Sequence, residues 1–134
     1  MPTKAKILMV DDDLDFVEAT KIMLENKSYQ VVTACNGQEG LEKVEQERPD
    51  LIILDVMMPK KHGFEMCKEL KSNPQYAQIP VLLLTAVGQN IPLSTYTVEM
   101  GLHTEADDYA EKPIETDDLV ARVEDLLQRQ KRAN

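Results

Sequence analysis

The sequence lacks the features of several common protein classes. No run approaches the roughly 18 consecutive apolar residues of a membrane-spanning helix, so we expect no membrane partner. The N-terminal stretch reaches acidic residues after only a few apolar ones, which is not the pattern of a secretory signal. Repeats, low-complexity tracts and linkers are also missing. These absences predict a single cytoplasmic domain spanning 1–134, with a core over about 5–128 and no output domain.

Cysteine and histidine are few, with 2 of each in the chain. Cys35 and Cys67 stand far apart, no CxxC motif occurs, and the histidines are not clustered. This spacing argues against a zinc or redox site. We expect both cysteines to be reduced packing residues.

Basic side chains are outnumbered. The 15 lysines and arginines face 24 aspartates and glutamates, which gives a net charge of −9. This charge disfavours nucleic acid and acidic membrane surfaces as direct partners. The same charge favours a cation as a bound partner.

Hydrophobic runs of strand length recur along the chain. Their positions are 6–10, 29–34, 51–54 and 81–85, with a weaker fifth candidate at 106–111. The runs are unbroken rather than alternating, which is typical of parallel strands that are covered on both faces. Helical patterns lie between and after them, at 14–27, 36–48, 63–71 and 116–130. This order predicts a three-layer α/β fold with a mostly parallel sheet.

Chemically active side chains follow the predicted strands. They are Asp11, Asp12 and Asp13 after the first strand, Asp55 after the third, Thr85 at the end of the fourth and Lys112 after the fifth. Parallel α/β sheets bind ligands beyond the carboxyl ends of their strands. Carboxylates that meet there repel one another, and Mg²⁺ is the hard, oxygen-seeking cation that fits best. The same arrangement makes Asp55 a candidate nucleophile toward a phosphoryl group, with Thr85 and Lys112 binding the phosphoryl oxygens.

Four motifs carry a family resemblance. In chain order, "ILMVDDDLDF", "LIILDVMMPKKHGFEM", "VLLLTA" and "ADDYAEKPI" resemble the receiver domain of two-component response regulators, over essentially the whole chain. The resemblance implies a flavodoxin-like, doubly wound (βα)5 fold with strand order 2-1-3-4-5. It also implies phosphotransfer from a histidine kinase or phosphotransfer protein, rather than turnover as an enzyme.

The resemblance implies a role for each matching residue. Asp55 would accept the phosphoryl group, and Lys112 would bind it, before a cis-proline at 113. Mg²⁺ would be held by Asp11, Asp12, Asp55 and the backbone carbonyl of Met57. Thr85 and Tyr109 would form the conformational switch. Asp13 needs no direct role, and we interpret it as a surface acid near the start of the first helix.

The match departs from the family pattern between Thr85 and Lys112, which are 27 positions apart (112 − 85), a few more than usual. The excess lies in 90–109, so the fourth helix, which Pro92 would open, is the least defined element. The family's usual output surface, made by helix four, strand five and helix five, would bind the downstream protein target. Met57 and Val87 follow Asp55 and Thr85 by two positions. Because neither side chain orients water, we expect slow self-dephosphorylation.

Three alternatives use the same residues differently. In a haloacid-dehalogenase-type phosphatase Asp11 would be the nucleophile, but 134 residues leave no room for a cap domain and Asp55 would have no task. An FMN carrier would need a phosphate loop where the three aspartates stand. An EF-hand would need glycine at Phe16 and glutamate at Ile22.

Overall fold

The computed structural model describes residues 5–55, 63–86, 106–112 and 114–133. Its elements are β1 (Lys6–Val10), α1 (Leu14–Asn26), β2 (Gln30–Ala34), α2 (Gly37–Glu47), β3 (Leu51–Asp55), α3 (Gly63–Ser72), β4 (Val81–Ala86), β5 (Asp108–Lys112) and α5 (Thr116–Ala133). The predictions for Met57, Val87, Pro113 and a fourth helix opened by Pro92 lie outside these residues.

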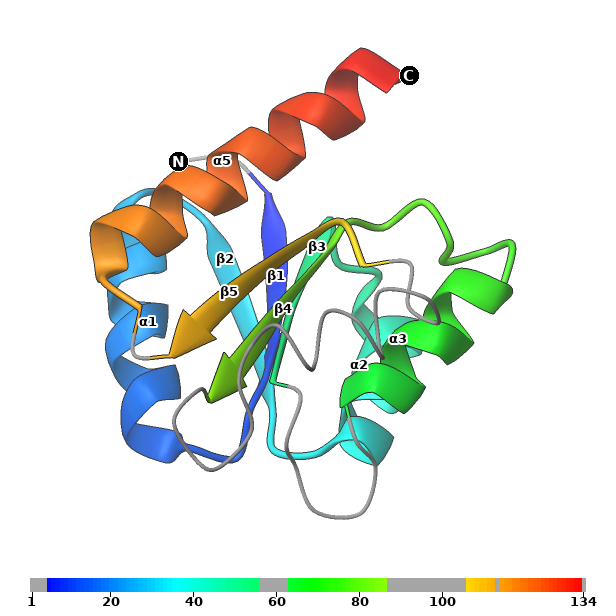
Figure 1. The fold of residues 1–134 in the computed structure, drawn as a ribbon, viewed down its shortest axis with the longest axis horizontal. Helices are drawn as coiled ribbons and strands as arrows, with labels where there is room; N and C mark the ends of the chain where they lie inside the picture. The colour runs from blue at the N-terminus through cyan, green and yellow to red at the C-terminus, as the bar shows by residue number, and fades with distance from the viewer. Residues whose placement is uncertain (1–4, 56–62, 87–105, 113, 134) are drawn as a thin grey trace.

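The five strands form one parallel sheet in the order β2-β1-β3-β4-β5. Helices α1 and α5 cover one face of this sheet, and α2 and α3 cover the other (Figure 1). The predicted flavodoxin-like architecture and its strand order are therefore confirmed.

Side chains alternate between the two faces of the central strands, as they must along any strand. Ile7 and Met9 of β1 pack into the core under α1 and α5, whereas Leu8 and Val10 pack into the core under α2 and α3. In β3 every residue is buried. Both faces are thus dry, which explains the unbroken apolar runs in the sequence.

Helix starts follow the capping signals. Asn36 caps α2, where its side chain accepts the backbone N–H of Glu39 at 2.9 Å, as its place three residues before Glu39 predicts. The Glu39 carboxylate in turn accepts the backbone N–H of Cys35 at 2.7 Å. Asp13 is exposed and caps α1, in line with its interpretation as a surface acid near the start of the first helix.

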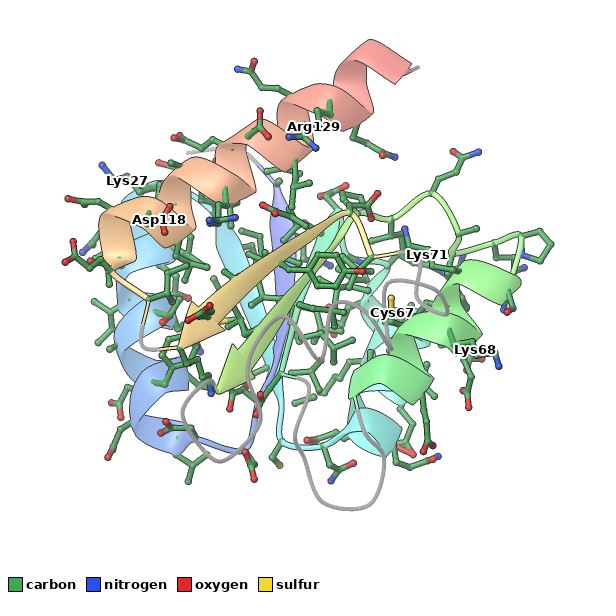
Figure 2. The ribbon with its side chains drawn as sticks, viewed as in Figure 1. Lys27, Cys67, Lys68, Lys71, Asp118 and Arg129 are labelled. Carbon is green, nitrogen blue, oxygen red and sulfur yellow. The ribbon has the colours of Figure 1, made fainter. Side chains whose placement is uncertain are left out.

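The prediction for the two cysteines is half wrong. Cys67 is fully buried and its sulfur lies between α3 and the sheet, whereas Lys68 points away from it (Figure 2). Cys35 is exposed instead, because it follows β2 at the open edge of the sheet, and its Sγ lies 3.1 Å from the Glu39 carboxylate. Among the described helices, none combines the length and the apolar character that a membrane crossing requires.

Candidate functional site

The register of the sheet brings Asp11 and Asp55 to the same level. Val10 pairs with Leu54 across β1 and β3, so the residues that follow them, Asp11 and Asp55, lie at the edge where both strands end. The backbone N–H of Asp11 is bound to the Ala34 carbonyl at 3.0 Å, which extends the β1–β2 ladder by one residue. Strand β3 includes Asp55 itself, one residue beyond the predicted end.

Three carboxylates gather at this edge. Oxygens of Asp11, Asp12 and Asp55 all lie within 4.8 Å of one another. Asp11 and Asp55 are buried, at 2% and 4% exposure, whereas Asp12 is exposed. The sequence predicted this meeting from two separate parts of the chain, Asp11 with Asp12 and Asp55. A buried acidic pair with an exposed third acid is a donor set that fits Mg²⁺, which keeps several of its waters.

Asp11 shows why a cation fits here. Its Oδ1 accepts the backbone N–H of Asp13 at 2.9 Å. Its Oδ2 is shielded from water and, within the described part of the chain, accepts no hydrogen bond of good geometry. Buried polar atoms of this kind are costly unless charge compensates them. Asp11 Oδ2 therefore requires positive charge beside it, which the Lys112 ammonium supplies at 2.7 Å.

Lys112 supplies positive charge to the same carboxylates. Its Nζ lies 2.7 Å from Asp11 Oδ2 and 3.8 Å from Asp55 Oδ2. The lysine side chain is only 15% exposed, so water screens these ion pairs weakly. The sequence predicted Lys112 at this site, and the structure places its ammonium nearer to Asp11 than to Asp55.

Sequence reasoning missed one member of the site. The ring of Phe16, on the first turns of α1, lies under the Lys112 ammonium, with 4.7 Å between Nζ and the ring centroid. Phe16 also packs against the core beneath α1 and α5. In the sequence it reads as one more apolar residue of an amphipathic helix, so no local signal marks it.

The proposed switch residues are placed only in part. Thr85 lies in β4 and pairs with Glu111 of β5, but its side chain lies outside what the structure describes. Tyr109 is in β5, and its ring packs partly buried against the core under α2 and α3. Met57 lies outside the described residues. The structure thus brings together Asp11, Asp12, Asp55 and Lys112, and leaves the remaining roles as predictions.

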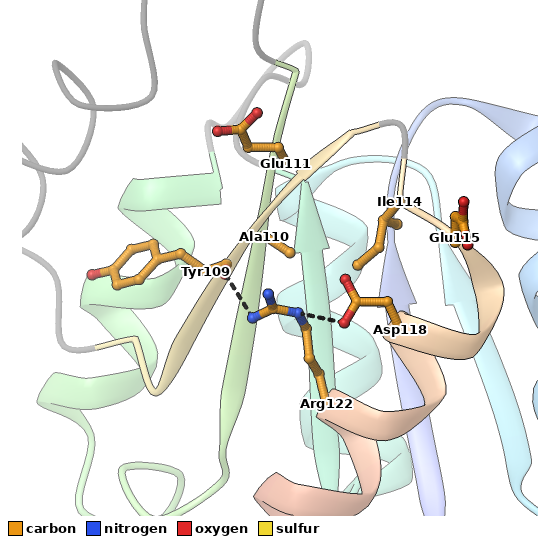
Figure 3. Close-up of a pocket in the computed structure, with 7 residues that line it drawn as sticks. All are labelled: Tyr109, Ala110, Glu111, Ile114, Glu115, Asp118 and Arg122. Carbon is orange, nitrogen blue, oxygen red and sulfur yellow. Dashed lines mark hydrogen bonds and ion pairs between the residues drawn. The ribbon is translucent and has the colours of Figure 1, made fainter.

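A groove of about 470 Å³ lies beside β5, on the side facing α5. Its lining residues are Tyr109, Ala110, Glu111, Ile114, Glu115, Asp118 and Arg122. In Figure 3 the guanidinium of Arg122 reaches toward the strand, where it donates to the Tyr109 carbonyl at 3.1 Å and pairs with Asp118. Burial lowers the pKa of Arg122, but the hydrogen bond and charge of Asp108 and the charge of Asp118 outweigh it and raise that pKa overall. Arg122 is thus a permanent cation at this groove.

The chain matches known proteins over nearly its whole length. The sequence model described as "Response regulator receiver domain" matches residues 7–124. The "Alkaline phosphatase synthesis transcriptional regulatory protein PhoP" of Bacillus subtilis is 43% identical over 124 residues, which are 92% of this chain and 49% of that protein. The "DNA-binding dual master transcriptional regulator RpaA" of Synechocystis is 40% identical, with 92% of this chain and 49% of that protein covered. This chain therefore spans about half the length of the curated relatives it matches.

These relatives bear on two of the expectations. They are transcriptional regulators rather than classical enzymes, in line with the expectation that the chain is no enzyme. Because one of them is named as DNA-binding, they lend no support to the exclusion of nucleic acid, which rested on net charge alone.

Solved structures agree with the sequence matches. A response regulator receiver domain protein from Clostridium thermocellum superposes with a TM-score of 0.83 at 29% identity, with 97% of this chain and 99% of that chain covered. The signal receiver domain of a histidine kinase from Syntrophus aciditrophicus gives 0.82 at 36% identity, with 92% and 90% covered. With the aspartate cluster, the lysine and the strand order in place, this chain belongs to the receiver domain family of two-component response regulators.

Proposed function

We propose that the chain accepts a phosphoryl group on Asp55, in a Mg²⁺-dependent reaction, from a histidine kinase or a phosphotransfer protein. The observation that carries this proposal is the meeting of Asp55 with Asp11, Asp12 and Lys112 at the carboxyl edge of the sheet. Asp55 is buried at the end of a central strand, and the desolvation of a buried carboxylate lowers the stability of the fold.

Each residue has a distinct part in the transfer. An oxygen of Asp55 forms a bond to phosphorus while the bond from phosphorus to the donor's histidine nitrogen breaks, and the imidazole leaves with the bonding electron pair. Lys112 neutralises a phosphoryl oxygen as a point charge. Asp11, Asp12 and Asp55 would hold Mg²⁺, with the Met57 carbonyl as a further ligand. The bound ion supplies positive charge for the equatorial phosphoryl oxygens.

The phosphorylated chain would then switch conformation. The phosphoryl group adds charge that Lys112 and the Thr85 hydroxyl bind, which favours a second packing of the Tyr109 ring. A population shift from mostly inactive to mostly active needs about 3–5 kcal/mol of differential stabilisation. Two or three charge-assisted hydrogen bonds, at about 1.5–3 kcal/mol each, are sufficient.

The downstream partner would dock on the surface that includes β5 and α5. The groove between these elements, with Arg122 held in it by Asp108 and Asp118, is the described part of that surface. The relatives named above are transcriptional regulators of about twice this length. We therefore propose that the controlled partner is a protein or protein segment, which need not be part of the same chain.

Phosphorylation by acetyl phosphate tests the proposal and separates it from the phosphatase alternative. The parent protein, Asp55→Asn and Asp11→Asn would be incubated with acetyl phosphate and Mg²⁺ and followed by intact mass. We expect one phosphoryl group on the parent protein and none on Asp55→Asn. Slow but measurable labelling of Asp11→Asn would support the proposal, because Asp11 assists the transfer without bonding to phosphorus. If labelling of Asp55→Asn persists while Asp11→Asn takes up nothing, Asp11 is the nucleophile and the proposal is wrong.

A further inference from the structure

The contact between Phe16 and Lys112 points to a role for an aromatic ring in the site. We propose that Phe16 is a positioning residue for phosphoryl transfer, which acts by holding the Lys112 ammonium over the carboxylate cluster. This inference rests on the proposed function. The family match and the motifs assign no role to Phe16, and among the described residues its ring contacts the site through the Lys112 ammonium.

Phe16 belongs to a closed circuit of contacts that begins and ends at Asp11. Asp11 Oδ1 accepts the Asp13 N–H at 2.9 Å, and Asp13 Oδ1 accepts the Phe16 N–H at 3.2 Å. The Phe16 ring lies 4.7 Å from Lys112 Nζ, which in turn lies 2.7 Å from Asp11 Oδ2. The same carboxylate thus fixes the start of α1 and, through that helix, the ring under its own counter-ion.

The surroundings make this cation–π contact effective. The Lys112 side chain is 15% exposed, and Phe16 is partly buried against the core beneath α1 and α5. A cation is attracted to the face of an aromatic ring, and the attraction grows when water is excluded. An aliphatic side chain of similar size would fill the same space without attracting the ammonium.

The Lys112 ammonium needs a group that fixes its position, because the lysine side chain is flexible. Its four-carbon stem carries a compact point charge that lacks a fixed orientation. In the structure the ammonium is 1.1 Å nearer to Asp11 than to Asp55, from 3.8 Å minus 2.7 Å. During transfer it has to serve a phosphoryl group on Asp55. A neutral ring holds the ammonium near both carboxylates without competing with them as an anion would.

The test compares Phe16→Leu, which removes the ring face, with Phe16→Tyr, which keeps it. Met23→Leu is the matched control, since Met23 lies on the same helix and packs partly buried against the same core. Initial rates of phosphorylation by acetyl phosphate at saturating Mg²⁺ would be measured by intact mass. We expect Phe16→Leu to be about three- to tenfold slower, the scale of a partly desolvated cation–π contact. Phe16→Tyr and Met23→Leu should stay within about twofold of the parent protein, because the first keeps an aromatic ring at position 16 and the second leaves Phe16 unchanged.

NMR supplies a second measurement that does not depend on the reaction. A ring beneath the ammonium shifts the resonances of the Lys112 side-chain methylene protons upfield. This shift should be present in the parent protein and in Phe16→Tyr, and lost in Phe16→Leu. A parent protein without it overturns the inference.

The outcomes separate the inference from the proposed function. A parent protein that takes up no phosphoryl group overturns the proposed function, and the inference with it. A parent protein that is phosphorylated, but no faster than Phe16→Leu, overturns the inference alone. Equal slowing of Phe16→Leu and Phe16→Tyr would also overturn it, because the effect would then come from packing and not from the ring face.

Discussion

Lys112 Nζ lies 2.7 Å from Asp11 Oδ2, in an ion pair that joins the ends of β5 and β1. The two side chains are 15% and 2% exposed, so each depends on the other for charge compensation. Removing one partner of a buried pair is destabilising because the other charge is left without compensation. Since both residues belong to the carboxylate site, a substitution at the site also changes the free energy of unfolding.

Replacing Lys112 by methionine should make the stability of the protein depend more on Mg²⁺. Without the ion we expect Lys112→Met to lower the free energy of unfolding by about 2–3 kcal/mol, since Asp11 loses its counter-ion. Saturating Mg²⁺ binds the folded state and neutralises the carboxylates, so the gap to the parent protein should narrow to within about 1 kcal/mol. Urea unfolding with and without Mg²⁺ measures both gaps.

Lys6→Met is the control for this prediction. Lys6 pairs with Glu47 at 3.2 Å at the opposite end of β1, away from the carboxylate cluster. Its substitution should cost a similar amount with and without Mg²⁺. The prediction for Lys112 is wrong if the difference between Lys112→Met and the parent protein is the same in both buffers.

Lys71 makes a set of buried contacts that we expect to stabilise the fold more than a surface ion pair does. Its side chain is 7% exposed, and its ammonium donates to the carbonyls of Ala77 and Ile79 and to Asp107. Lys71→Met removes this donor from both carbonyls and from Asp107, which keeps the Val81 N–H at 2.8 Å, and should lower the free energy of unfolding by about 2–3 kcal/mol. Figure 2 shows Lys71 at the end of α3, next to the loop that it braces.

Arg129→Met is the comparison for Lys71→Met. Arg129 and Asp125 also form a close ion pair, at 2.6 Å, but their side chains are 59% and 54% exposed. Exposed pairs on one helix contribute about 0.3–0.5 kcal/mol. Urea unfolding should therefore show a severalfold larger loss in the free energy of unfolding for Lys71→Met than for Arg129→Met. Equal losses would contradict the role given to Lys71.

Tyr29 should make the fold lose stability at alkaline pH. Burial, and then the charge of Glu124, raise the pKa of Tyr29 above its ordinary value of 10.0. Above about pH 10 the unfolded chain therefore releases this proton more readily than the folded chain, and the free energy of unfolding falls as the pH rises. Below pH 10 both states keep the proton and the effect vanishes.

Urea midpoints at pH 8 and pH 10.5 test the contribution of Tyr29. The loss of stability between these values should be smaller in Tyr29→Phe than in the parent protein. Equal losses in Tyr29→Phe and the parent protein would show that Tyr29 does not contribute.

The aspartyl phosphate should be long-lived. Met57 and Val87 stand two positions after Asp55 and Thr85, where a polar side chain would orient an attacking water molecule. We expect the phosphorylated protein to persist for minutes or longer in Mg²⁺ buffer once the donor is removed, and Met57→Asn to shorten that lifetime. Decay within seconds in the parent protein would contradict this prediction.

The sequence predicted the fold well because its signals are local. The unbroken apolar runs at 6–10 and 51–54 are two of the three interior strands, and Asn36 with Glu39 marks the start of α2. The fifth strand was predicted at 106–111 and is found at Asp108–Lys112. It is a polar edge strand, with a burial pattern that is mostly intermediate or exposed, so hydrophobicity defines it poorly.

The parts that were missed depend on distant contacts. Lys71 and Asp107 are 36 positions apart, and Phe16 meets Lys112 from the other end of the chain. Neither pairing leaves a periodic pattern, because the partners come together only when the sheet is assembled. The carboxylate cluster was predictable despite such distances, since every acid followed a strand that ends at the same edge.

Mapping the phosphoryl group to one residue tests the central claim most directly. The protein would be treated with acetyl phosphate and Mg²⁺, reduced with borohydride, digested and sequenced by mass spectrometry, since borohydride converts an aspartyl phosphate to homoserine. We predict homoserine at position 55 alone, and none when Mg²⁺ is removed by EDTA. Homoserine at position 11, or unmodified aspartate at 55 in a protein that has gained a phosphoryl group, would contradict the account.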